Sequence, residues 1–128
     1  GHLEEPCCWG DWVAWSDQAA TKPYVGNAYF HHSAVLLASI ATALDEGNDA
    51  LAWTALADRS RRAIRARYRS VEGAWDNGTQ SALVHALHFH LCDAEERPAL
   101  EKSLADDLAR HGRITTGCLG TTWLMPAK

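Results

Sequence analysis

The chain has 128 residues, of which 47% are hydrophobic and 22% charged, with a net charge of -4 and a pI near 5.9. This length and apolar content are enough for one globular unit with its own core, and the weakly acidic balance argues against nucleic acid or an anionic membrane as a partner. No apolar run of 18 residues is free of polar interruption, so we expect no membrane-spanning helix.

Residues 1–26 are rich in Trp, Gly, Pro and Asp and show no sustained helical period, which predicts a loop. This loop carries Trp9, Trp12 and Trp15, which are half of the six tryptophans in the chain. An indole offers a flat apolar face and an N–H donor, and it therefore suits core packing and stacking on a sugar alike. The surplus of tryptophan favours a binding role.

Five helices joined by short turns are expected after this loop. Their predicted ranges are 27–46, 48–70, 80–92, 98–111 and 118–125. Asn27 and Thr79 have side chains that suit N-caps, and Gly47 and Gly112 stand where the first and fourth helices should end.

The expected helices alternate between two kinds of surface. The first, third and fifth are apolar around most of their circumference and should be buried on nearly all sides, whereas the second and fourth have one apolar stripe and a charged remainder. Alternation of this kind in antiparallel hairpins predicts an all-α fold with two concentric layers, as in an (α/α)6 toroid or an α-solenoid. The helices share no fixed-period repeat signature, which disfavours the solenoid.

The histidines of the third helix raise the question of a metal site. His85 and His88 are three residues apart and share a helix face, so a further ligand could complete a site. We favour the interpretation that these imidazoles satisfy helix or loop groups or line a polar cavity, and we predict neither a metal nor a cofactor.

The cysteines show neither C-x-x-C spacing nor the density of a disulfide scaffold. They are Cys7, Cys8, Cys92 and Cys118. This usage favours a reducing compartment such as the cytoplasm, although it leaves the localisation of a longer parent protein open.

Most acidic residues fall at expected helix ends or on outer faces, where solvated charge is the ordinary role. Asp11 differs because it stands between Gly10 and Trp12 in the aromatic loop. An indole can stack on the apolar face of a sugar while a carboxylate accepts its hydroxyl hydrogens. The G-x-S-x-G, P-loop and G-x-G-x-x-G motifs are absent from the sequence, which leaves acyl transfer and nucleotide chemistry unsupported.

Four blocks of the sequence match a family pattern in order and in spacing. The blocks are Gly10-Asp11-Trp12, Asn27-Ala28-Tyr29-Phe30, Thr79-Gln80-Ser81-Ala82 and the run from Gly112 to Thr121 (GRITTGCLGT). Together they resemble the central part of the family 78 glycoside hydrolases, the bacterial α-L-rhamnosidases. The resemblance implies that residues 1–128 are a single partial domain of an (α/α)6 six-hairpin toroid, with 1–26 as a loop segment and 27–128 as about five of its helices.

The resemblance also implies a pocket for terminal α-L-rhamnose and inverting hydrolysis by two carboxyl groups. In the family the acid lies before the first block and the base after the last, so no catalytic residue is expected within this chain. Carried over residue by residue, the expected substrate contacts are Asp11, Trp12 as a stacking wall, Tyr29 and Gln80. The expected partner is a rhamnoside, and neither nucleic acid nor membrane is expected.

Within such a fragment the apolar inner helices would lie uncovered, which predicts self-association. Two alternatives remain open at this point. One is a helical scaffold or protein-interaction module that only shares the toroid's pattern, and the other is a different α/α-toroid carbohydrate enzyme, such as a lyase or another glycosidase.

Overall fold

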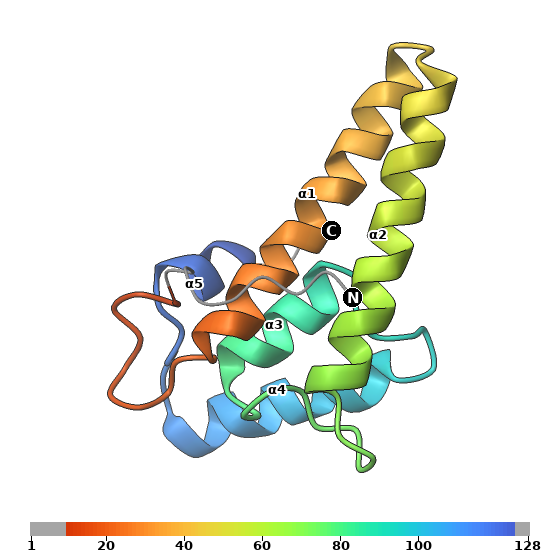
Figure 1. The fold of residues 1–128 in the computed structure, drawn as a ribbon. Helices are drawn as coiled ribbons and strands as arrows, with labels where there is room; N and C mark the ends of the chain where they lie inside the picture. The colour runs from red at the N-terminus through yellow and green to blue at the C-terminus, as the bar shows by residue number, and fades with distance from the viewer. Residues whose placement is uncertain (1–9, 125–128) are drawn as a thin grey trace.

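The computed structural model describes residues 10–124, which form five helices and no strand (Figure 1). The helices are α1 Lys22–Ala43, α2 Gly47–Tyr68, α3 Gln80–His88, α4 Arg97–His111 and α5 Cys118–Leu124. The prediction of an all-α fold built from antiparallel hairpins is confirmed. Cys7, Cys8, Trp9 and the expected helix end at Met125 lie outside the described residues. Among the described residues, no helix has the length and apolar character that a membrane crossing requires.

Helix α1 begins five residues earlier than predicted, with Pro23 in its first turn, where a missing N–H costs nothing. The predicted N-cap at Asn27 is wrong, because Asn27 is fully buried in the second turn and its amide donates to the carbonyl of Pro23 at 2.8 Å. The predicted stop at Gly47 is also wrong. The chain leaves the helix after Ala43, Asp45 adopts a φ of 59°, and Gly47 opens α2.

The capping signals of α3 and α4 are confirmed. The hydroxyl of Thr79 accepts a hydrogen bond from the N–H of Ala82 at 3.4 Å, and Gly112 closes α4 with a φ of 61°. Helix α3 is shorter than predicted, because it ends at His88 and the chain then turns through His90 at a φ of 55°.

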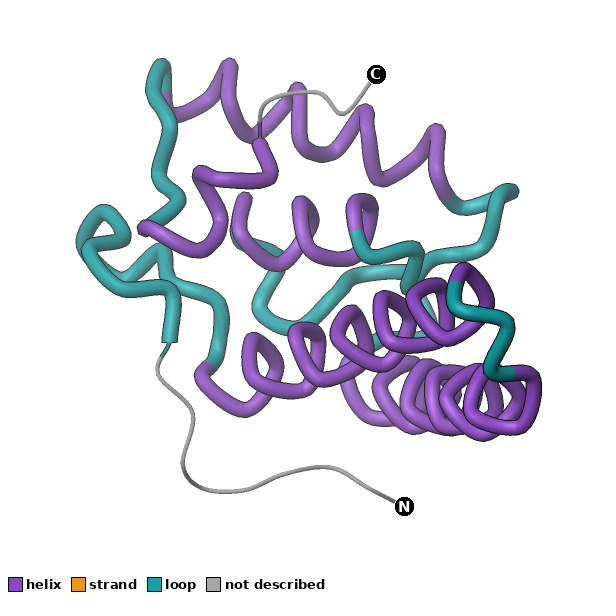
Figure 2. The backbone as a smooth tube through the Cα atoms, turned by 90° about the horizontal axis from the view of Figure 1, so that it is seen from above, coloured by secondary structure: helices purple, strands orange, loops and turns teal. Residues whose placement is uncertain are grey.

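Helix α3 occupies the middle of the molecule, between α4 and the α1–α2 hairpin, with α5 beside it (Figure 2). Its residues from Gln80 to Leu87 are all buried. Helices α2 and α4 instead bury one stripe each, which agrees with the predicted inner and outer roles. The core around α3 contains the largest fully buried side chains of the described chain, among them Trp75, Tyr24, Phe89, Ile64 and Leu91.

The expectation that the first and fifth helices are buried on nearly all sides is wrong for the second half of α1 and for α5, in which only Gly120 is buried. Helix α1 has 22 residues and α3 only 9, so the α1–α2 hairpin projects beyond the helix that covers its first half (Figure 1). The projecting part exposes large apolar side chains, which we call the hairpin ridge: Val35, Leu36, Leu37, Ile40, Leu44 and Leu51.

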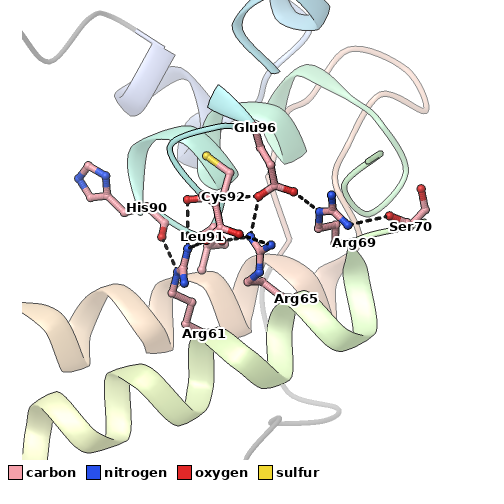
Figure 3. A network of polar contacts seen from close by, with 9 residues as sticks. Arg61, Arg65, Arg69, Ser70, His90, Leu91, Cys92 and Glu96 are labelled. Carbon is pink, nitrogen blue, oxygen red and sulfur yellow. Dashed lines mark hydrogen bonds and ion pairs between the residues drawn. The ribbon is translucent and has the colours of Figure 1, made fainter. Parts of the chain in front are cut away.

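A polar network joins the hairpin to the turn between α3 and α4 (Figure 3). Arg61 and Arg65 are four residues apart on one face of α2, and Arg69 is the residue that follows the end of this helix. Arg61 donates to the carbonyl of His90 at 2.9 Å, and Arg65 donates to the carboxylate of Glu96 at 2.7 Å. Arg69 also binds Glu96. Three arginines thereby hold the turn against the outer helix.

Glu96 is the most strongly perturbed acid of this network. Burial by itself raises its pKa, but hydrogen bonds from Arg65, from the N–H of Asp93 and from Arg69 outweigh burial and lower the pKa to about 2. The folded state therefore binds this proton less readily than the unfolded chain does.

We expect Glu96→Gln to lower the free energy of unfolding by about 1–3 kcal/mol at pH 7, since two guanidinium groups lose their charged acceptor. Because the folded pKa lies below the ordinary value of 4.5, this contribution is full above that pH and is lost as the pH falls toward about 2. Urea denaturation of both proteins at pH 7 and at low pH measures the difference.

The matched control is Glu101→Gln, whose exposed partner Arg97 lies four residues away on the same helix. A pair of this kind contributes only about 0.3–0.5 kcal/mol. Equal losses in the two variants, or a Glu96→Gln loss that does not change with pH, would contradict the role given to the network.

Candidate functional site

Three loops gather at the end of the molecule where α1, α3 and α5 begin, and we call this region the loop end. The loops are residues 10–21, 69–79 and 112–117. Thr21 donates from its N–H and its hydroxyl to the two carboxylate oxygens of Asp76, both at 2.7 Å. The N–H of Trp15 donates to the carbonyl of Thr115 at 3.0 Å. These bonds join the first loop to each of the other two.

Asp11 anchors the first loop to the start of α5. It is 2% exposed, and one carboxylate oxygen accepts from the N–H groups of Leu119 and Gly120 at 2.8 and 2.9 Å. The other oxygen accepts from the N–H of Gly117 at 2.8 Å and from the hydroxyl of Ser81. A helix leaves its first N–H groups without acceptors and favours negative charge at that end. Asp11 supplies both acceptors and charge from a distant part of the chain.

Glycine is required where this loop meets α5. A Cβ at position 120 would lie 2.7 Å from the hydroxyl of Ser81 and 2.9 Å from the carboxylate of Asp11, and a Cβ at position 117 would overlap the backbone of the first loop. The N–H of Cys118, between them, donates to the carbonyl of Trp12 at 2.8 Å. Helix and loop therefore approach too closely at these two positions for any residue with a Cβ.

Gln80 and Tyr29 hold the third loop and α5 in place. Gln80 is fully buried; its amide oxygen accepts from the N–H of Thr115 at 2.9 Å, and its nitrogen donates to the carbonyl of Arg113 at 3.2 Å. The hydroxyl of Tyr29 donates to the carbonyl of Leu119 at 3.2 Å and accepts from the indole of Trp123 at 2.8 Å. Both side chains therefore have their polar atoms engaged within the protein.

Trp12 is the exposed member of the four predicted substrate contacts. Its side chain is 79% exposed, whereas Asp11 and Gln80 are buried and Tyr29 is half-buried. The structure brings Asp11, Trp12 and Gln80 to the loop end, while Tyr29 contacts α5 from within α1. Three of the four predicted residues therefore hold a loop or α5 in place, and the fourth, Trp12, is exposed.

Sequence reasoning did not single out Ser81 or Arg113. Ser81 donates to Asp11, and the guanidinium carbon of Arg113 lies 4.5 Å from the ring centroid of Trp15. Ser81 belongs to a block that matched the family pattern, and Arg113 directly follows the glycine that stops α4. Both residues stand within blocks of the family pattern, and this position could have marked them as candidate site residues.

Of the histidines on α3, His85 makes a contact of the expected kind, with a helix group, through one of its two ring nitrogens. His85 is fully buried, stacks on Phe89 with ring centroids 5.3 Å apart, and contacts the carbonyl of Leu119 through Nε2 at 3.4 Å. Burial is the main cause that lowers the pKa of His85, which keeps its imidazole neutral near pH 7. Between residues 10 and 124, no group of three or more His, Cys, Asp or Glu could hold a metal ion.

Three grooves on the described surface lie outside the first loop. One runs between residues 69–78 and α4, a second between the α3–α4 turn and α5, and a third between the α1–α2 hairpin and the α3–α4 turn. None of these three includes a residue of the loop 10–21. Trp12 therefore stands on a projecting surface, outside these three grooves.

Comparisons with known proteins agree on one group of enzymes. The model of the bacterial α-L-rhamnosidase six-hairpin glycosidase domain matches residues 4–127. An α-L-rhamnosidase of Streptomyces avermitilis is 39% identical over 119 residues, which are 92% of this chain and 11% of that protein.

Two solved structures are similar to the chain. The crystal structure of Streptomyces avermitilis α-L-rhamnosidase complexed with L-rhamnose matches with a TM-score of 0.88 and 37% identity over 97% of this chain and 12% of that one. The native enzyme of Aspergillus terreus matches with a TM-score of 0.83 and 29% identity over 91% of this chain and 14% of that one. The chain therefore spans only about an eighth of the length of these relatives.

We expect Asp11→Ala to lower the free energy of unfolding by about 3 kcal/mol or more, because three N–H groups and one hydroxyl lose a buried charged acceptor. Chemical denaturation measures the loss, and amide hydrogen exchange should accelerate at Gly117, Leu119 and Gly120. The control is Asp17→Ala, an exposed acid of the same loop whose carboxylate accepts a hydrogen bond from the neighbouring Gln18. Similar stability of the two variants would contradict the anchoring role.

Proposed function

The chain belongs to the family of bacterial α-L-rhamnosidase six-hairpin glycosidase domains, and from this membership we propose that it forms part of an enzyme that releases terminal α-L-rhamnose from glycosides. The observation that carries the proposal is the family match over residues 4–127, which includes all three loops of the loop end. The similarity to an enzyme crystallised with L-rhamnose supports a carbohydrate as the partner.

Trp12 is the proposed wall of the rhamnose site. Its ring is exposed, while its own carbonyl is bonded to the N–H of Cys118 and the preceding Asp11 is fixed at four points. A stacking residue on an anchored backbone loses little freedom when the ligand binds, which favours affinity. The apolar face of a deoxy sugar is suited to an indole.

Asp11, Tyr29 and Gln80 remain predictions as direct sugar contacts. Their side chains bond to backbone groups of α5 and of the third loop, which supports a positioning role for the three residues. In that role they position Trp12 and the third loop. The sugar would then bind to a surface that is already ordered before binding.

We propose that the catalytic acid and base come from other parts of a longer protein. Inverting hydrolysis needs one carboxylic acid at the leaving oxygen and one carboxylate with room for a water. Two acids of the loop end, Asp11 and Asp76, do not meet this need, because Asp11 accepts four hydrogen bonds and Asp76 binds Thr21 with both oxygens. The small share of the relatives that this chain spans is consistent with the proposal.

Trp12→Ala should weaken the binding of L-rhamnose about tenfold, since the stacking face is lost and aromatic contacts contribute about 0.5–1.5 kcal/mol beyond burial. Stability should change little, because the side chain is exposed. Titration calorimetry and tryptophan fluorescence with millimolar rhamnose measure the change. The control is Leu51→Ala, an exposed apolar side chain on the remote α1–α2 hairpin. Unchanged affinity in Trp12→Ala, or no binding by the unaltered chain, would refute the sugar site.

We further propose that the chain by itself self-associates through the hairpin ridge. The six side chains of the ridge are between 37% and 73% exposed, and an apolar patch of this kind on a soluble protein usually has a partner. A second copy offers the same surface, so a two-fold arrangement would bury both ridges together.

The double change Ile40→Lys with Leu44→Lys should shift the chain toward the monomer, because two charges would have to be buried in the contact. Analytical ultracentrifugation over a range of concentrations follows the equilibrium. Val71→Lys is the control, since this side chain is 96% exposed and lies outside the ridge. A chain that is monomeric at every concentration before any substitution would remove the basis of the proposal.

A further inference from the structure

We propose that Trp15 and Arg113 form a second recognition surface beside Trp12, and that this surface takes a hexuronate joined to the rhamnose. The rhamnose half of this ligand rests on the function proposed above, whereas the uronate half rests on its own geometry. The surface would select glycosides in which the sugar next to the rhamnose carries a carboxylate.

The charge of Arg113 is not neutralised within the described chain. Its guanidinium carbon lies 4.5 Å from the ring centroid of Trp15, and no ion pair of Arg113 occurs among residues 10–124. By contrast, Arg61, Arg65 and Arg69 each bind a carboxylate. The side chain of Arg113 is exposed and that of Trp15 is 55% exposed. A solvent-accessible guanidinium therefore lies over a partly exposed indole ring.

Both residues are held by backbone hydrogen bonds. The N–H of Trp15 donates to the carbonyl of Thr115, and the N–H of Thr115 donates to the amide oxygen of Gln80. The nitrogen of the same Gln80 amide donates to the carbonyl of Arg113. Since Gln80 is fully buried at the start of α3, the ring and the guanidinium are supported by the core. A ligand would find them already near each other, which lowers the entropy cost of binding.

The pairing of these two groups matches the chemistry of a uronate. A guanidinium forms two parallel charge-assisted hydrogen bonds with a carboxylate, and an indole packs on the apolar face of a pyranose. A neutral sugar would use only the ring and a simple anion only the guanidinium. A sugar acid uses both, which is why we assign this class of ligand.

The surface is continuous with the proposed rhamnose site. Trp12 and Trp15 are three residues apart, and a chain of that length spans at most about 10 Å between Cα atoms. A turn from Asp11 to Ala14 shortens the path further, with the N–H of Ala14 donating to the carbonyl of Asp11 at 3.3 Å. Neighbouring sugars of one glycoside can therefore reach both indoles.

The test compares two disaccharides with the full 128-residue chain. One has α-L-rhamnose joined to a hexuronate, and the other has the same linkage to the neutral hexose. Titration calorimetry should give about tenfold tighter binding of the uronate form, and Arg113→Gln should remove that difference between the two forms. Higher salt should weaken only the uronate form. Arg62→Gln, an exposed arginine on α2, is the control and should change neither affinity.

Free hexuronate and free rhamnose separate this proposal from the one above. Loss of hexuronate binding in Arg113→Gln, in a chain that does not bind rhamnose, would support the uronate surface and refute the rhamnose site. Rhamnose binding with equal affinity for the two disaccharides would refute the uronate surface alone. Circular dichroism checks that Arg113→Gln folds as the unaltered chain does. A folded Arg113→Gln chain that keeps the preference for the uronate form would also overturn the assignment.

Discussion

The carboxylate of Asp11 accepts hydrogen bonds from Ser81 and from the backbone of Gly117, Leu119 and Gly120, residues that follow it by 70 to 109 positions. It therefore joins the first loop to α3 and to α5 at once. A buried charge is costly unless it is fully hydrogen-bonded, and here the free N–H groups of a helix start supply the donors. The position of Trp12, the next residue, follows directly from this contact.

At the loop end, the residues that hold the loops in place are different from the residues that are exposed for ligand binding. Buried polar side chains, above all Asp11 and Gln80, use their hydrogen bonds to hold backbone, and the exposed Trp12, Trp15 and Arg113 project from that backbone. A binding surface on loops is precise only when the loops themselves are fixed. The proposed rhamnose and uronate contacts both depend on this arrangement, since neither lies on a regular helix.

Charged groups hold the turn between α3 and α4 in place. Arg61, Arg65 and Arg69 bind the α3–α4 turn through its carbonyls and through Glu96, and they hold the α1–α2 hairpin to the body (Figure 3). Beyond this network the hairpin has no covering helix in the described chain, and the hairpin ridge is exposed. The strong anchor and the open apolar surface thus lie on one hairpin, which suits an element that packs against further protein.

Local signals in the sequence were sufficient for the all-α fold, the buried α3 and the outer α2 and α4, the Thr79 cap and the Gly112 stop, because each depends on residues within one or two helical turns. The family blocks contain Asp11, Ser81 and Gly117, which the structure brings together. Only the tertiary structure decided that Asn27 lies inside a helix, that α1 outreaches α3, and that Asp11 is a buried anchor beside an exposed Trp12. The partners of Asp11 are 70 or more residues away from it in the sequence. Burial depends on how the helices pack against one another, and a local sequence pattern carries no information about that packing.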